Sequence, residues 1–434
     1  MLNIINANKK NFLQNLDLIL QKRKNQSNTI DNTVKKILND IKKNKDKALI
    51  KYEKKFSKNK NLSIKKIKFS NFEINKIIKQ LDRATKKSID LAYNRIVKFH
   101  KKQKLSIFSI KDNLNNVLAY QVSPIAKVGV YVPGGLASYP SSVLMNCIPA
   151  LVAGVKEIYM ATPSTSSKYN PAVIYAAKKC KVKEIYKIGG AQAIAALAYG
   201  TQSVKKVDKI VGPGNAYVAQ AKKIVFGDVG IDMIAGPSEV TIVADQYSNP
   251  NWVAADLIAQ AEHDESSQSI LIANNLSTIQ KVKQCLVQQL KNLPKKIIAT
   301  KSLKNNGLAI LTKNKNSLVS IINLIAPEHL EIFLKNPNSI LSKIENAGSI
   351  FLGPYSPEAV GDYLAGPNHV LPTSGSARFS SGLSVYDFLK RRSVIKMSKS
   401  GIERLGLSVI NLANYENLEG HANSIKIRLK KEDK

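Results

Sequence analysis

The chain contains little cysteine: Cys147, Cys180 and Cys285 are the only three in 434 residues. Their number is odd and no C-x-x-C pair occurs, so we expect neither a disulfide framework nor a thiolate metal site. No uninterrupted apolar run approaches the roughly 18 residues of a membrane helix. The first residues also lack the apolar segment of a signal peptide. These absences predict a cytoplasmic protein without a membrane partner.

Common sequence motifs of phosphate and zinc chemistry are absent as well. The chain has neither a GxGxxG nor a GxxxxGK[ST] loop, so no standard dinucleotide or P-loop motif can be assigned. It has five histidines, none of them in HExxH spacing. That absence argues against a zincin-type hydrolase.

Acidic residues are scarce: 66 Lys+Arg stand against 31 Asp+Glu, a formal net charge of +35. The usual interpretation of such an excess is nucleic-acid binding. However, the excess is mostly lysine, accompanied by asparagine and isoleucine, whereas arginine is what bidentate phosphate and base contacts favour. We interpret the lysines as solvated surface residues and expect no nucleic-acid partner. A basic nucleic-acid-binding protein built on an inactive enzyme fold is the alternative from another class.

The length allows two or more domains, and the pattern along the chain predicts an α/β protein. The first 105 residues show helical periodicity, and residues 108–125 indicate a hairpin. From Lys127 onward, short apolar strands alternate with helical segments, and a second such series starts at Asn251. This alternation is typical of βαβ units with parallel sheets. A shorter tail follows from about Tyr386.

Three glycine-containing junctions are candidates for ligand contact: GVYVPGG (129–135), KIGGAQAIAAL (187–197) and KIVGPGNAYVAQAKK (209–223). Exposed backbone N–H groups at a helix start bind phosphate. Tight turns between sheet and helix explain the same glycines, so both interpretations stay open at this point.

Four of the five histidines, His263, His329, His369 and His421, lie beside an acid, a glycine or a proline. His100, flanked by lysines, is expected at the surface. In NWVAADLIAQAEHDE, Gln260 and His263 are three residues apart and share a helix face. With Asp362, they offer nitrogen and oxygen ligands of the kind that suit zinc or another divalent ion. Buried, hydrogen-bonded polar residues are the alternative.

Glu328 and His329 form a second focus. Pro327 predicts the start of a helix with both side chains in its first turn. A helix N-terminus lowers the pKa of a histidine and favours its proton-accepting form. Adjacent residues on a helix face different directions, so the pair would divide the proton transfers. A capping glutamate and a packed histidine are the alternative.

Taken in order, the motifs GVYVPGG, SSVLMNCIPA, GGAQAIAALAYGT, VGPGNAYVAQAKK, GPSEV, DLIAQAEHD, APEHLEI, GDYLAGPNHVLPTSGSARF and GHAN resemble the histidinol dehydrogenase family. The resemblance is dense from 127 to 390 and weaker in the first 100 residues. It implies two incomplete Rossmann-like domains with parallel sheets, plus small N- and C-terminal segments used in dimerisation. The implied domains are 26–130 with 238–386 for zinc and catalysis, 131–237 for NAD, and 1–25 with 387–434 for dimerisation.

The resemblance also implies the chemistry and the residues that carry it. L-histidinol would be oxidised through L-histidinaldehyde to L-histidine with two NAD⁺, the last step of histidine biosynthesis. Glu328 and His329 would be the catalytic pair. One Zn²⁺ per subunit would be bound by Gln260, His263, Asp362 and His421, the last from the partner of a homodimer with shared active sites. The substrate contacts would be these four ligands with Ser238, His329, His369 and Glu416, and the NAD⁺ contacts Tyr131, Gln192 and Asn215.

In the implied mechanism, zinc anchors the imidazole and amino groups of the substrate and does no redox work. His329 accepts the hydroxyl proton, Glu328 activates water to hydrate the aldehyde, and His329 then deprotonates the hydrate. Leu136 and Ser138 depart from the Thr and Pro that we would expect beside the NAD loop. A zinc-dependent dehydrogenase for another amino alcohol is the alternative enzyme.

Overall fold

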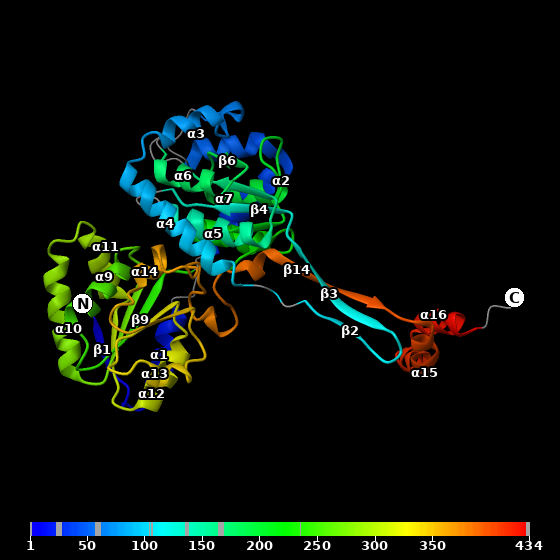
Figure 1. Cartoon of the computed structure of the whole chain (residues 1–434). Helices are drawn as coiled ribbons and strands as arrows, with labels where there is room; N and C mark the ends of the chain where they lie inside the picture. Colours follow the sequence, from blue (N-terminus) through cyan, green and yellow to red (C-terminus); the bar gives the residue numbers. More distant parts are fainter. Residues whose placement is uncertain are drawn as a thin grey trace. The chain divides into compact units, whose positions relative to one another are not determined.

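The computed structural model describes residues 2–22, 28–56, 62–103, 105, 107–134, 139–163, 169–234 and 236–430. These residues form two compact units (Figure 1). Unit 1 contains Met1–Gln103 and Ala126–Asp387, and unit 2 contains Lys104–Ile125 and Phe388–Lys434. Leu136 and Ser138 lie outside the described residues.

One parallel sheet of unit 1 has five strands in the order β6-β5-β4-β7-β8. The chain enters it at β4 and adds strands first on one side and then on the other. Strand order therefore reverses between β4 and β7, where open α/β sheets bind ligands at their carboxyl ends. The strands are β4 (Lys127–Tyr131), β5 (Glu157–Ala161), β6 (Glu184–Tyr186), β7 (Lys209–Val211) and β8 (Gly230–Ile231).

Helices cover both faces of this sheet. Helix α7 is alanine-rich and buried almost all round, as expected for a helix inside a layered core. It packs against α2, which is interrupted at Lys45, and against α8. The helices are α2 (Asn28–Phe56), α3 (Asn71–Ile78), α4 (Arg83–His100), α5 (Pro140–Ala153), α6 (Pro171–Lys179), α7 (Gly190–Tyr199) and α8 (Ala216–Val225). A short 3₁₀ turn, η1 (Ile64–Lys66), precedes α3.

The other parallel sheet of unit 1 has six strands in the order β1-β11-β10-β9-β12-β13. Strands β9 and β10 are buried along their whole length, which their apolar runs predict for a sheet covered on both faces. The strands are β1 (Asn3–Asn6), β9 (Glu239–Ala244), β10 (Gln268–Ala273), β11 (Leu308–Leu311), β12 (His329–Ile332) and β13 (Ser349–Leu352).

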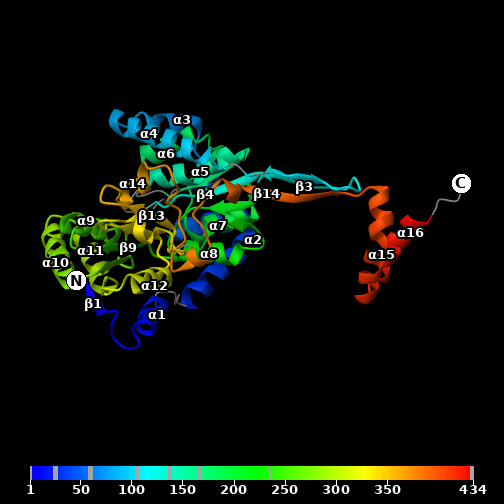
Figure 2. The same cartoon turned by 60° about the horizontal axis from the view of Figure 1, so that its bottom comes forward.

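Separate sets of helices cover the two faces of this sheet (Figure 2). On one face lie α9 (Pro250–Ala261), α10 (Leu276–Leu290) and α11 (Lys296–Asn305). On the other lie α1 (Phe12–Lys22), α12 (Lys315–Ile325) and α13 (Asn338–Leu341). The short elements α14 (Glu358–Tyr363), η2 (Ser376–Arg378) and η3 (Val385–Phe388) follow the last strand.

Unit 2 contains an antiparallel sheet in the order β14-β3-β2, followed by a helix pair (Figure 1). The predicted hairpin at 108–125 is confirmed as β2 (Ser109–Lys111) and β3 (Val117–Pro124). Strand β14 (Leu389–Lys396) pairs along all of β3 and leads to α15 (Lys399–Tyr415) and α16 (Glu419–Leu429).

The predicted α/β class with two parallel sheets is confirmed, but several segments pack differently from the expected domain grouping. Helix α2, expected with residues 238–386, packs instead on α7 and α8 through apolar residues such as Val34 and Leu49. From the same expected segment, α4 packs on α5, and β4 is the central strand of the five-stranded sheet. Strand β1, expected with the tail, pairs with β11 in the six-stranded sheet. His100, expected at the surface, is buried, with Nδ1 2.8 Å from Gln103 Oε1. Among the described residues, no helix has the length and apolar character needed to cross a membrane.

A buried ion pair fixes the turn after β7. Lys222 on α8 pairs with Asp232 and donates to the carbonyl oxygen of Gly212 at 3.0 Å. Asp232 Oδ2 accepts from the N–H of Gly212 at 2.8 Å. We predict that Lys222→Met lowers the free energy of unfolding by about 3 kcal/mol, since it leaves a buried carboxylate without its counter-ion.

Urea unfolding followed by circular dichroism measures this effect. The double variant Lys222→Met/Asp232→Leu should recover part of the loss, because it removes both charges together. A single variant as stable as the parent would contradict the prediction.

Candidate active site

Glu328 and His329 lie at the beginning of a strand, so the predicted helix is wrong at this point. Helix α12 ends at Ile325, and Ala326 adopts a left-handed conformation with φ 48°. A residue before proline is disfavoured in the α region, so Pro327 helps to end the helix. His329 then starts β12, whose side chains are buried.

The backbone of Glu239, the first residue of β9, binds both side chains. Its N–H donates to Glu328 Oε2 at 2.8 Å, and its carbonyl oxygen lies 3.0 Å from His329 Nδ1. Because a carbonyl oxygen only accepts, Nδ1 must carry the proton in this hydrogen bond. Nδ1 is also 3.7 Å from Glu328 Oε2. The two groups therefore lie together, whereas a helical turn would have separated them.

This tautomer leaves His329 Nε2 as a basic nitrogen. Nε2 is buried and without a hydrogen-bond partner among the described residues. It lies 4.0 Å from Asp362 Oδ1. Burial lowers the pKa of His329 to about 4, against the opposing charge of Asp362. The predicted direction of the shift is confirmed, but its cause is burial, since no helix begins here. At neutral pH the ring is uncharged and can accept a proton.

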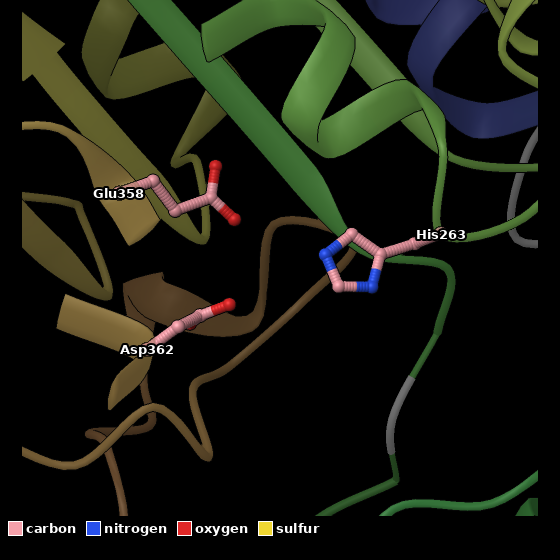
Figure 3. A group of neighbouring side chains, drawn as sticks. All are labelled: His263, Glu358 and Asp362. Atoms are coloured by element: carbon pink, nitrogen blue, oxygen red, sulfur yellow. The ribbon is translucent and has the colours of Figure 1, made fainter. Parts of the chain in front are cut away.

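Three side chains beside His329 form a potential metal site (Figure 3). One ligand atom each of His263, Glu358 and Asp362 lies within 4.8 Å of the others. The two carboxylates come from one face of α14 and point towards the ring of His263, which follows the end of α9. A histidine nitrogen with two carboxylate oxygens suits a borderline divalent ion such as zinc.

Gln260 is in the last turn of α9, three residues before His263, and is completely buried. Neither its amide oxygen nor its amide nitrogen has a hydrogen-bond partner among the described residues. A buried amide with no partner is costly and uncommon in native proteins, and each case calls for an explanation such as an ion. The residues present therefore fit a metal that takes an oxygen from Gln260.

A group of buried carboxyl groups extends behind this site. Glu331 Oε1 accepts from the backbone N–H of Glu358 at 2.6 Å, and Glu331 also interacts with Asp256 on α9. Burial raises the pKa of Asp256 to about 6 and raises those of Glu331 and Glu358 well above the usual range; neighbouring carboxylates add to the last two shifts. In a chain of net charge +35, this concentration of acids would suit a cation.

The remaining expected substrate contacts fall into two groups. His369 Nδ1 lies 3.6 Å from Asp362 Oδ1, and Ser238 immediately precedes β9. Burial acts to raise the pKa of Asp362, but its hydrogen bond to His369 and the surrounding histidines hold it below the usual range. Unit 1 thus brings Ser238 and His369 to the same end of the six-stranded sheet as His329. Glu416 and His421 belong to unit 2, where both are exposed.

The expected cofactor contacts follow three strands of the five-stranded sheet. Tyr131 ends β4, Gln192 is in the first turn of α7 after β6, and Asn215 is the N-cap of α8 after β7. All three lie at the carboxyl ends of the strands, the usual ligand edge of such sheets. Asn215 is exposed, and its Oδ1 accepts from the N–H groups of Tyr217 and Val218 at 3.1 Å. The alternative interpretation, that these loops form tight turns between strand and helix, therefore also applies to Asn215.

Sequence reasoning missed several groups of this site. Glu358 could have been found, because it precedes Asp362 by four residues and therefore shares its helix face. Glu239 acts through its backbone N–H and C=O groups, which no side-chain pattern can indicate. Glu331 occupies a position in an apolar strand that gives no sign of its carboxyl neighbours.

Comparison with known proteins gives a consistent result. A family model described as histidinol dehydrogenase matches residues 20–429. The histidinol dehydrogenase of Pelagibacter ubique (strain HTCC1062) is 56% identical over 99% of this chain and 100% of the relative. That of Dechloromonas aromatica (strain RCB) is 47% identical over 96% of each. A crystal structure of histidinol dehydrogenase from Elizabethkingia anophelis superimposes with a TM-score of 0.92 at 39% identity, covering 99% of this chain and 98% of that one.

Proposed function

The chain belongs to the histidinol dehydrogenase family of oxidoreductases, and from this premise we propose that it oxidises L-histidinol to L-histidine through L-histidinaldehyde. An alcohol that becomes a carboxylic acid loses four electrons, and each NAD⁺ accepts two of them as a hydride, so two NAD⁺ are reduced. This is the last step of histidine biosynthesis, and we place it in the cytoplasm.

The observation that carries the proposal is the unpaired Nε2 of His329. It is a neutral imidazole nitrogen with a fixed tautomer, buried beside Asp362 and the potential metal group. A base of this kind is required to remove the hydroxyl proton while a hydride leaves the carbon that bears the hydroxyl group. Glu328, which accepts from the backbone N–H of the same residue Glu239, is placed to act on a second proton.

We propose a zinc ion bound by Gln260, His263 and Asp362 from unit 1 and by His421 from a partner subunit. The unpaired amide of Gln260 and the clustering of His263 with Asp362 support this ligand set. When bound, the zinc supplies a Lewis-acidic anchor for the imidazole and amino nitrogens of the substrate. Glu358 belongs to the same cluster and is an additional oxygen donor at this site.

The residues of the chain then divide the proton transfers. His329 Nε2 takes the hydroxyl proton of histidinol during the first hydride transfer to NAD⁺. Glu328 takes a proton from the water that adds to the aldehyde. His329, once it has released that first proton to solvent, takes the proton of the hydrate during the second hydride transfer. Ser238, His369 and Glu416 bind substrate in this proposal, and Tyr131, Gln192 and Asn215 bind NAD⁺. The burial of His329 and Glu328 excludes bulk water between the two steps.

We propose a homodimer that shares its active sites. Exposed apolar side chains on unit 2 support it, because monomers rarely leave such surface uncovered. Ile110, Leu118 and Ile395 are cross-strand neighbours in the register of its sheet, and each is exposed. On α15, Leu405, Val409 and Leu412 are exposed at the spacing of one helix face. In the proposed dimer, each copy would contribute its own Glu416 and His421 to the active site of the other copy.

The test is stoichiometric. We expect the purified, zinc-loaded protein to form about two NADH per L-histidinol when NAD⁺ is in excess, because both oxidations occur on the same enzyme. NADH is followed by absorbance, and histidine by chromatography.

Another amino alcohol, L-alaninol, is the control, since it lacks the imidazole that the site is proposed to bind. A folded, zinc-loaded protein that forms no NADH from histidinol would overturn the proposal. NADH formed equally well from alaninol would instead support the broader amino-alcohol dehydrogenase.

A further inference from the structure

The buried carboxyl group of Glu53 lies beneath the expected cofactor turn and has no part in the chemistry described so far. Glu53 is on α2 and is completely buried. Its Oε1 accepts from the backbone N–H of Gly189 and from Gln192 Nε2, each at 2.9 Å. Its Oε2 has no partner among the described residues. Burial raises its pKa to about 7 in spite of these two hydrogen bonds.

Glu53 caps α7 because the residues that usually supply a cap cannot do so here. Gly189 is the N-cap, and a Cβ at this position would lie 2.5 Å from Pro163 Cβ. Gly190 has φ +65°, and its Cβ would lie 2.8 Å from Gln192 Oε1. Both positions therefore require glycine, which has no side chain to accept from the first N–H groups of the helix. The carboxyl group of Glu53, on α2, acts as the acceptor for the N–H of Gly189 instead. Tyr131 Oη accepts from the N–H of Gly190 at 3.0 Å.

The same contact orients the amide of Gln192. Oε1 of Glu53 accepts two N–H groups, so it stays an acceptor whether or not Oε2 carries a proton. The amide of Gln192 must therefore turn its NH₂ towards Glu53 and its carbonyl oxygen away from it. That oxygen lies over Gly190, beside the turn that begins α7.

We propose that Glu53 is a positioning residue that makes Gln192 a hydrogen-bond acceptor for the dinucleotide. The group that Gln192 takes is then a donor, either a ribose hydroxyl or an amide or amino N–H, and not a phosphate oxygen. Glu53 itself does not touch the cofactor. The inference rests on the proposed use of NAD⁺ but not on the identity of the alcohol.

The test separates cofactor binding from turnover. NAD⁺ affinity is measured by titration calorimetry, and KM for NAD⁺ and kcat are measured with saturating L-histidinol. Glu53→Ala should raise Kd and KM for NAD⁺ tenfold or more, with kcat at saturating NAD⁺ within threefold of the parent. Glu53→Gln, which keeps the acceptor oxygen, should stay within threefold in all three values. The loss in Glu53→Ala should not add to that of Gln192→Ala, because both remove the same contact.

Asp46→Ala is the matched control. Asp46 is also a buried acid on α2, but it accepts from Ser203 Oγ at 2.8 Å and has no contact with the cofactor turn. It should lower thermal stability and leave Kd for NAD⁺ unchanged. Equal losses of NAD⁺ affinity in Asp46→Ala and Glu53→Ala, or an unchanged affinity in folded Glu53→Ala, would contradict the inference. If Glu53→Ala does not fold, a Glu53→Gln variant with tenfold weaker NAD⁺ binding contradicts it equally.

Cofactor analogues identify the donor. Deoxyribose analogues of NAD⁺ lack one hydroxyl, the 3-acetylpyridine analogue lacks the carboxamide NH₂, and the hypoxanthine analogue lacks the adenine amino group. One of them should bind Gln192→Ala and the parent equally well, whereas equal sensitivity for all would overturn the acceptor role. A parent that binds NAD⁺ but does not oxidise histidinol would refute the proposed function and leave this inference standing. A parent that binds no NAD⁺ would refute both.

Discussion

His329→Asn should lower kcat about a thousandfold, the central range for the loss of a positioned general base. Asparagine keeps a nitrogen donor for the carbonyl oxygen of Glu239 and removes the basic Nε2. The fold, the zinc content and Kd for NAD⁺ should therefore stay close to those of the parent. Steady-state kinetics at saturating substrates, with zinc measured by atomic absorption, test this expectation.

His100→Asn is the matched control, because His100 is a second buried histidine whose pKa burial lowers and whose Nε2 has no partner among the described residues. It lies at the end of α4 and contacts Gln103. Its replacement should leave kcat within a factor of about three. A similar kcat in His329→Asn and His100→Asn would exclude His329 as the base.

Gln260→Leu should abolish zinc binding and with it nearly all turnover, while it makes the metal-free protein more stable. Leucine has a similar volume and removes two buried polar atoms that have no partner in the described chain. We expect a gain of about 1 to 2 kcal/mol in the free energy of unfolding after chelation, the usual cost of one unsatisfied buried group. Zinc content and urea unfolding with and without a chelator measure the two effects.

Gln220→Leu is the comparison, since Gln220 is a buried glutamine whose Nε2 donates to Asp31 Oδ1 at 2.6 Å. This variant should lose stability, because it removes a satisfied hydrogen bond, and should keep its zinc. If Gln260→Leu retained zinc, or if it destabilised the chelated protein as Gln220→Leu does, Gln260 would be a structural residue and no ligand.

Much of the fold was predictable because its central strands carry apolar runs between glycine-containing turns. β9 and β10 are buried at every position, and such runs between glycine turns indicate a parallel sheet. The packing of the N-terminal segments was not predictable. Strand β1 has four residues with two asparagines, and only its long-range pairing with β11 makes it a strand. Helix α2 has an apolar face that would suit either sheet.

The site residues were predictable where chemistry and local sequence coincide. His263, His329 and Asp362 are residue types that ligate metals or transfer protons, each beside an acid, a glycine or a proline, and the structure brings them together. The backbone around His329 was not predictable, because Pro-Glu-His resembles a helix start. Glu53 is flanked by tyrosine and two lysines in the chain, which indicates a solvated face. Only the packing of α2 on α7 buries it.

Glu328 and His329 both bind the backbone of one residue, Glu239, so a shift of its strand would move the contacts of both side chains together. His329 lies opposite Val240 in the pairing of β12 with β9, and a one-residue slip would turn it to the other face of the sheet. The positions of Glu328 and His329 thus depend on the register between β9 and β12. Substitutions at Val240 or Leu330, which lie deep in the sheet, should therefore impair Glu328 and His329 together. We therefore expect substitutions in the hydrophobic interior of this sheet to lower turnover, measured as kcat, as well as stability.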